Sequence, residues 1–174
     1  MDKIKNLTAL GKYLKKIGAR ASKIASVANI NAKTISLLST DSSRTIYAEE
    51  FYRVIMTAIK QANLPDEAFE NAIEEIFPNR EKVKLLEEFQ DYSSEALFFK
   101  SHMQQQSSVE KKLKIPDGKL SKYFGDRKKR VIAAEMIGFI EGMGYDMLTT
   151  FEKIYGKIKL ESDVTENNEN ITEN

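Results

Sequence analysis

The side chains of this chain that are best suited to chemistry are its cations, which gather in two blocks. The 174 residues carry a formal charge of only +1, yet the charge is +7 over residues 1–63, −7 over 64–99, +6 over 100–160 and −5 over 161–174. Four cations stand in a row at Arg127–Arg130. Clustered ammonium and guanidinium groups attract polyanions such as the phosphate backbone of a nucleic acid. The two basic blocks therefore indicate two docking places for a polyanion, although the acidic segment between them also fits the solvated face of connecting helices.

Side chains for catalysis or metal binding are scarce. The chain has no cysteine and a single histidine, His102, which excludes thiolate nucleophiles, disulfides, cysteine-ligated zinc and any histidine-based triad or metal cage. The pairs Glu74-Glu75 and Glu87-Glu88 have no histidine or aspartate pattern around them, so solvated helix faces explain them better than an acid/base pair. We expect a protein that is not an enzyme and that uses no metal and no cofactor.

The spacing of apolar residues is helical along nearly the whole chain. Apolar side chains recur every three or four residues within 4–17, 51–59, 69–77 and 148–158. Sustained alternation of apolar and polar residues and hairpin signals are both absent from the sequence, so it predicts an all-α fold. No apolar run approaches the roughly 20 residues of a membrane helix, and the start lacks the apolar region of a secretory signal. With cysteine absent as well, we expect a cytoplasmic protein that makes no membrane contact.

The chain contains an internal repeat. Residues 22–59 and 107–144 align without a gap at an offset of 85 residues, with seven identities in 38 positions. The identical pairs are Ser22/Ser107, Ile30/Ile115, Ser36/Ser121, Asp41/Asp126, Ala48/Ala133, Glu50/Glu135 and Ile55/Ile140. Apolar positions match more often than identities do, which indicates that both copies bury the same face of the same helices.

The repeat divides the chain into three parts. We expect a first unit over residues 1–78 and a second unit over 79–160, with the boundary in the charged stretch after Pro78. Residues 161–174 are acidic, rich in asparagine and poor in apolar residues. Such a segment cannot bury enough surface to offset its ordering entropy, so we expect a disordered tail.

Each copy of the repeat has the residue spacing of a helix-turn-helix. In the first copy the pattern rests on the apolar residues of two short helices, an isoleucine in the turn between them and an asparagine that can cap the second helix. These residues are Ile24, Ala25, Ile30, Asn31, Thr34, Ile35, Ser36 and Leu38, and the stretch Ala48–Ile59 follows as a closing helix. The spacing resembles the Cro/repressor (Xre-type) family of λ-repressor-like DNA-binding domains, over residues 7–60 and, through the repeat, 94–145.

Three features of the chain depart from that family. The Glu-x-Gly that usually closes the second motif helix is replaced by Ser39-Thr40-Asp41 and by Phe124-Gly125-Asp126. The family usually has glycine in the turn, where this chain has Asn29 and Lys114, and asparagine accepts a left-handed backbone more readily than lysine does. A glutamine that commonly holds a phosphate at the start of the first motif helix is absent, but Ser22, Ser107 or Lys23 stands nearby to donate instead. The resemblance implies a small helical bundle in which the first motif helix holds the second one ready to enter a major groove.

The resemblance also implies which residues meet DNA. The base-facing positions of the second motif helix are Ala32, Lys33 and Leu37 in the first unit, and Asp117, Gly118 and Lys122 in the second. Further DNA contacts, mainly to phosphate, are implied for Ser22, Lys23, Asn31, Thr34, Ser36, Arg44, Ser107, Lys119, Ser121, Arg127, Lys128, Lys129 and Arg130. No arginine, asparagine or glutamine occupies a base-facing position, so direct reading of base edges is modest and affinity comes mainly from charge.

These patterns predict a protein that binds double-stranded DNA as a transcriptional regulator of the bacterial or phage type. The two basic blocks favour this interpretation. The small set of base-reading side chains favours a second interpretation, a protein-interaction module of the antitoxin or adaptor kind that keeps the fold without reading bases. The sequence does not decide between a monomer and a homodimer.

Overall fold

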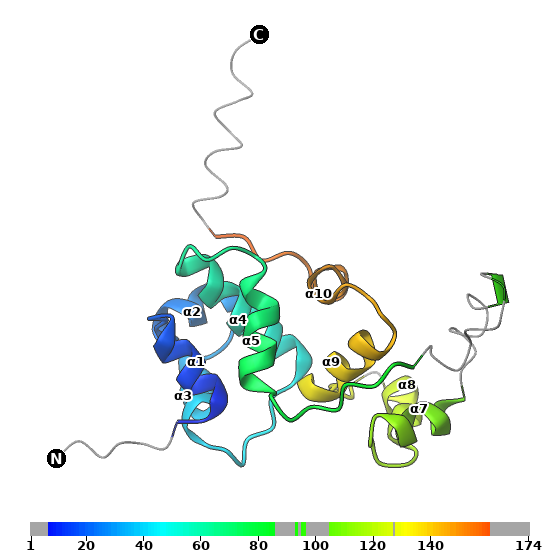
Figure 1. Ribbon diagram of the computed structural model, residues 1–174. Helices are drawn as coiled ribbons and strands as arrows, with labels where there is room; N and C mark the ends of the chain where they lie inside the picture. Colours follow the sequence, from blue (N-terminus) through cyan, green and yellow to red (C-terminus); the bar gives the residue numbers. More distant parts are fainter. Residues whose placement is uncertain (1–6, 86–92, 94, 97–104, 127, 161–174) are drawn as a thin grey trace, which may run out of the picture.

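Helices make up the regular structure of the chain. The computed structural model describes residues 7–85, 93, 95–96, 105–126 and 128–160. Within them the helices are α1 (Ala9–Lys16), α2 (Ala21–Ala28), α3 (Ala32–Thr40), α4 (Ala48–Gln61), α5 (Ala68–Ile76), α7 (Gln106–Lys112), α8 (Lys119–Gly125), α9 (Ala133–Gly142) and α10 (Met147–Tyr155), as Figure 1 shows. The predicted all-α fold is confirmed for this part of the chain. The β-type pairing within it is a single antiparallel bridge between Tyr47 and Ile132.

Several features that the sequence singled out lie outside the described residues. They are Glu87-Glu88, His102, Arg127 and the tail 161–174, for which disorder stays a prediction. Among the helices that are described, none is long and apolar enough to cross a membrane.

Short polar side chains start three of the helices. The Thr8 hydroxyl accepts a hydrogen bond from a backbone N–H in the first turn of α1 at 3.0 Å. The Asn31 carboxamide does the same for α3 and the Asp146 carboxylate for α10, each at 2.8 Å. The first N–H groups of a helix have no partner within the helix, so these side chains satisfy them and set where each helix begins.

Helix α4 is the centre of the first unit. Residues 54–59 of this helix are all buried, and α2 and α5 pack against it. Helix α1 packs against α5 and comes so close to α3 that a Cβ atom at Gly11 would lie 2.1 Å from the carbonyl oxygen of Ser39. Thr8 strengthens this contact, because its backbone N–H donates to the same carbonyl oxygen at 3.0 Å. The close approach fixes α3 against α1.

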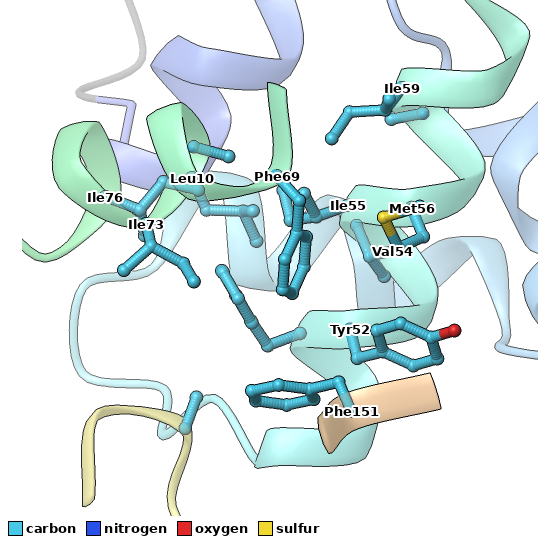
Figure 2. Close-up of a cluster of buried hydrophobic side chains, with 14 of the residues drawn as sticks. Leu10, Tyr52, Val54, Ile55, Met56, Ile59, Phe69, Ile73, Ile76 and Phe151 are labelled. Atoms are coloured by element: carbon cyan, nitrogen blue, oxygen red, sulfur yellow. The ribbon is translucent and has the colours of Figure 1, made fainter. Parts of the chain in front are cut away.

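Helix α10 comes late in the sequence but packs into the core of the first unit. Its Phe151 lies against Tyr52 of α4 and Phe69 of α5, with ring centroids 5.7 and 5.6 Å away (Figure 2). The Tyr52 hydroxyl donates a hydrogen bond to the carbonyl oxygen of Gly156, just beyond α10, at 2.8 Å. Aromatic rings packed at such distances contribute large buried areas. One continuous core therefore contains residues of both units, including Ile137 of α9.

A second, smaller core joins α7, α8 and α9 to the segment 79–85, which has no helix or strand. Its buried members are Leu85, Val109, Leu113, Ile115 and Met143. The backbone N–H of Leu85 donates to the carbonyl oxygen of Gly142 at 2.7 Å. A Cβ atom at Gly142 would lie 2.8 Å from Cγ of Leu85, so the absence of a side chain in α9 is what lets the segment pack there.

Arg80 anchors the same segment between the two units. Its side chain is only 3% exposed and lies between Glu74 of α5 and Glu141 of α9. Its Nη1 donates to Glu74 at 3.1 Å and its Nη2 to Glu141 at 2.7 Å. Hydrogen bonds from Arg80, and then from Lys82, hold the pKa of Glu74 at about 2. The segment 79–85, called the connector below, is thus held in place by ion pairs as well as by apolar packing.

The two copies of the repeat share their local geometry. The turns after α2 and α7 each contain a non-glycine residue in the left-handed conformation, Asn29 and Lys114, with φ of 53° at both. The next residue in each copy, Ile30 or Ile115, donates its N–H to the carbonyl oxygen five positions earlier, at 3.3 and 2.9 Å. The offset of 85 residues seen in the sequence is therefore also an offset between equivalent turns.

A local two-fold axis relates the copies where they meet. Ala48 donates its N–H to the carbonyl oxygen of Val131 at 2.8 Å, and Ala133 donates to that of Ile46 at 2.9 Å. Exchanging equivalent residues of the two copies turns one bond into the other. Helices α4 and α9 begin at this bridge and pack against each other. The symmetry ends at Gly142, where α9 stops, and α10 turns back onto the first unit.

Candidate nucleic-acid interface

Helices α2 and α3, the first helix pair, are held across each other by a buried inner face. Ile24 and Ala28 of α2 are buried, and so are Ile35 and Leu38 of α3, as their spacing predicts. Ile30, between the helices, is half-buried against them. With one face of α3 fixed in the core, its opposite face is left as a surface for a partner.

Lys33 is the cation that α3 presents in its first turn. Its side chain is exposed, and none of the ion pairs in the described part of the chain includes it. Its backbone N–H is satisfied by the neutral side chain of Asn31 at 2.8 Å. Of the other predicted residues on α3, Ser36 is exposed, while Ala32, Thr34 and Leu37 are half-buried. The beginning of α3 therefore carries a cation that takes part in none of these ion pairs. The carboxylates of Glu49 and Glu50, which line one hollow with Asn31 and Thr34, are paired with Arg53 and Arg130 instead.

The remaining predicted residues of the first unit lie at the surface on either side of α3. Ser22 and Lys23 are exposed on α2, and Arg44 is exposed in the loop that follows α3. That loop is ordered by Asp41, whose carboxylate accepts hydrogen bonds from the N–H and hydroxyl of Ser43 at 3.0 and 2.6 Å. The same hydrogen bonds lower the pKa of Asp41. Arg44 is thus carried by a loop of defined shape.

Helices α7 and α8, the second helix pair, are joined by a buried carboxylate. Glu110 of α7 is 2% exposed. One of its oxygens accepts from the N–H of Gly118 at 2.9 Å and the other from the N–H of Leu120 at 2.7 Å. A carboxylate at this place satisfies the first N–H groups of α8 and is favoured by the helix dipole. It also brings a negative charge to the start of α8, the end that the family resemblance places against DNA.

The sequence pattern did not single out Glu110, because its counterpart in the first copy is Ala25. One signal was present. The capping Asn31 of the first copy is replaced by Pro116 in the second, and proline has no side chain that can cap a helix. The loss of one cap requires another acceptor for the first N–H groups of α8, and Glu110 supplies it.

Lys119, predicted to contact phosphate, is turned toward the protein. Its ammonium forms an ion pair with Glu135 of α9, and both side chains are mostly buried, at 21% and 17% exposed. The other oxygen of Glu135 accepts a hydrogen bond from the Tyr123 hydroxyl at 2.5 Å. Burial, and then this bond to Glu135, raises the pKa of Tyr123. The charge of Lys119 is therefore largely neutralised within the second unit.

The basic run after α8 divides between the surface and the junction of the units. Lys128 and Lys129 are exposed in a loop that matches the loop after α3, and the N–H of Lys128 donates to the Asp126 carboxylate at 2.9 Å. Arg130 points to the first unit instead. Its Nη2 lies 2.9 Å from Glu50 of α4, and its guanidinium carbon is 4.1 Å from the centre of the Tyr47 ring. Arg130 thus contributes to the junction.

The other predicted residues of the second helix pair are at the surface. All five are exposed: Ser107, Asp117, Gly118, Ser121 and Lys122. Ser121 donates its hydroxyl hydrogen to the side-chain oxygen of Gln106 at 2.9 Å. Of the predicted base-facing positions on this side, Lys122 supplies a cation and Asp117 an anion directly before α8. The second helix pair is therefore less basic at its helix start than the first.

No protein-family model, curated protein or solved structure matches the chain. In the part of the chain that is described, no three or more His, Cys, Asp or Glu side chains come together in a way that could hold a metal ion.

Proposed function

We propose that the chain binds double-stranded DNA as a transcriptional regulator of the bacterial or phage type, through two helix-turn-helix units in tandem. The observation that carries the proposal is the first helix pair. Its α3 is fixed on one side by buried Ile35 and Leu38, and it presents the exposed ammonium of Lys33 in its first turn. A rigid helix with a cation near its N-terminal end is suited to enter a major groove.

Phosphate contacts supply most of the affinity in this proposal. Lys23 on α2 and Arg44 in the loop after α3 are exposed in the first unit, and so are Lys128 and Lys129 after α8 in the second. Ammonium and guanidinium groups at such places attract the backbone irrespective of base sequence. Lys33 is the side chain of the first unit that reaches toward acceptors on guanine, so the direct reading of bases rests on few groups.

A second candidate function, a protein-interaction module, is favoured by the second helix pair. Glu110 and Asp117 place negative charge around the start of α8, and Lys119 is neutralised by Glu135. A helix with that charge distribution repels phosphate at the end where docking requires attraction. If both pairs act on proteins alone, duplex DNA is not a ligand at all, which gives a direct test.

The test is the salt dependence of duplex binding. Fluorescence anisotropy would be followed with a labelled mixed-sequence duplex on the order of 30 base pairs, about three helical turns. Over about 50 to 200 mM salt, we expect log affinity to fall against log salt with a slope of roughly −0.9 for each phosphate engaged, hence about −3 to −5 in total. The absence of binding at the lowest salt would favour the interaction module.

A pair of matched variants shows whether α3 is the contacting surface. Lys33→Ala removes the cation at the start of α3, whereas Lys153→Ala removes an exposed cation of α10, outside both helix pairs. We expect the first change to weaken binding and the second to leave it within experimental error. Equal effects of the two variants would mean that only overall charge matters and that α3 does not dock.

A further inference from the structure

The junction between the two copies of the repeat is symmetric. The bridge between Tyr47 and Ile132 is antiparallel and joins equivalent positions of the two copies. Its two hydrogen bonds, from Ala48 and from Ala133, are equivalent as well and nearly equal in length, at 2.8 and 2.9 Å. Each bridging residue follows the loop that leaves α3 or α8. At the bridge itself the two copies are therefore related as two subunits of a two-fold dimer are related. Away from it the packing differs, because α3 buries Ile35 and Leu38 in the larger core whereas α8 has no buried residue and borders the smaller core.

The junction is also built to hold its shape. Ala48 and Ala133, at its centre, are 1% and 0% exposed, and α4 and α9 bury their neighbouring apolar residues in a common core. The Arg130–Glu50 ion pair ties its edge, and Arg80 fastens the connector to α5 and α9. Buried packing combined with directed polar contacts holds two bodies in one relation more firmly than a flexible linker can.

Two helix pairs joined through a two-fold bridge have a counterpart in duplex DNA. Half-sites that are inverted repeats of each other share the two-fold symmetry of the double helix, and paired helix-turn-helix units recognise them about one helical turn apart. We propose that a single copy of this chain spans two inverted half-sites of one duplex, with no second copy required. The inference rests on the proposed function, because it describes how the DNA is engaged.

The covalent connection changes how such a site is bound. When the first helix pair is docked, the second is held near its half-site at a high effective concentration, on the order of millimolar for short connections. Binding by one chain therefore does not depend on the concentration of a dimer. A homodimer of small units, in contrast, loses affinity when dilution separates its subunits.

The two half-sites are unequal in this proposal, because the two helix pairs differ in charge. The first pair begins α3 with Asn31, which is neutral, and Lys33. The second begins α8 with the carboxylate of Glu110. We expect the half-site under α3 to tolerate few base changes and the half-site under α8 to tolerate many.

The experiment is a selection from duplexes with about 26 randomised base pairs, enough for two half-sites roughly 10 base pairs apart. The full chain is the binding protein, and native mass spectrometry then gives the number of chains on the selected duplex. The expected result is one chain on one duplex, and a selected sequence with two inverted, unequally conserved halves. Two chains per duplex, one isolated half-site or two halves in the same orientation would each overturn the inference while leaving DNA binding intact. Failure to retain any duplex at low salt would remove the proposed function, and the inference with it.

A proline pair tests the junction itself. Ala133 is the first residue of α9, where proline is well tolerated by a helix, but Ala133→Pro removes the N–H that bonds to Ile46. Ala9→Pro makes the same change at the exposed first residue of α1, away from the junction. We expect Ala133→Pro to lower affinity for the selected two-half site on the order of tenfold and to broaden the accepted spacing, and Ala9→Pro to do neither. Equal affinity and spacing for both variants would mean that the bridge does not set the relation of the two helix pairs.

Discussion

Asn29 and Lys114 are equivalent residues of the repeat, and both hold the left-handed backbone conformation with φ of 53°. Each ends the first helix of its pair and redirects the chain so that the next residue, Ile30 or Ile115, enters the core region. The strain of this conformation is smaller for asparagine than for lysine. The turn therefore has the same shape in both copies, but its conformational strain is larger in the second copy.

Lys114→Gly tests that strain. We expect the free energy of unfolding to stay the same or rise by up to about 1 kcal/mol, because glycine adopts a positive φ freely. The variant also loses the ion pair of Lys114 with Glu81 at 2.5 Å, but an exposed ion pair adds little to the free energy of unfolding. Lys12→Gly, an exposed lysine in the middle of α1, is the control and should lose about 1 kcal/mol. Chemical denaturation measures both, and similar losses would show that position 114 is not strained.

The carboxylate of Glu110 gives a prediction that separates stability from binding. Glu110→Ala leaves the N–H groups of Gly118 and Leu120 without their acceptor, so we expect a loss of about 2 to 3 kcal/mol in the free energy of unfolding. Glu110→Gln keeps one acceptor oxygen but removes the charge from the start of α8. We expect a smaller loss of stability and tighter binding of a mixed-sequence duplex at low salt.

The control for this pair is Glu70→Gln, which removes an exposed negative charge from α5. If Glu70→Gln tightens duplex binding as much as Glu110→Gln does, the gain comes from overall charge. In that case the start of α8 does not face the duplex.

The sequence was informative about helices because each apolar stripe reports the buried face of its own helix. Ile35 and Leu38 are buried as their spacing predicts. A stripe does not report its partner, however. The stripe around Phe151 predicts α10 but contains no information that this helix packs on Tyr52 of the first unit. The early end of α9 at Gly142 is what frees α10 to turn back.

The sequence predicted where the cations of the candidate site lie, but it did not predict which carboxylates they form ion pairs with. Lys119 and Arg130 lie in the expected region, yet each meets a carboxylate that a count of charges does not connect with it. Those carboxylates, Glu135 and Glu50, are identical positions of the repeat. The two copies use them differently, because Glu135 faces a lysine of its own unit and Glu50 an arginine of the other unit. Such pairings depend on three-dimensional contacts between distant segments.

The ion pairs of the connector lead to a prediction about thermal stability at low pH. Hydrogen bonds from Arg80, and then from Lys82, hold the pKa of Glu74 at about 2, below the ordinary value of 4.5. A carboxylate whose pKa is lowered by folding stabilises the fold above its ordinary pKa, and this contribution is lost as pH falls toward the folded value. We expect the melting temperature to fall between about pH 4.5 and 2, and to fall less over that range in Glu74→Gln. Parallel profiles for the two proteins would show that the ion pairs of Glu74 add nothing to stability.

The basic run after α8 supports two distinct roles that one set of variants can separate. Lys128 and Lys129 are exposed, so replacing both with glutamine should reduce the salt dependence of duplex binding by roughly 0.9 in slope for each phosphate that is no longer neutralised, about 1.8 together. Because the proposed docking places them against the phosphate backbone, the loss of affinity should be similar for all base sequences. Arg130→Gln removes the same kind of charge from the same loop but breaks the interactions with Glu50 and Tyr47. We expect it to lower the melting temperature and to change the slope much less. If Arg130→Gln reduces the slope as strongly as the double variant and leaves stability unchanged, its guanidinium meets phosphate and the junction does not depend on it.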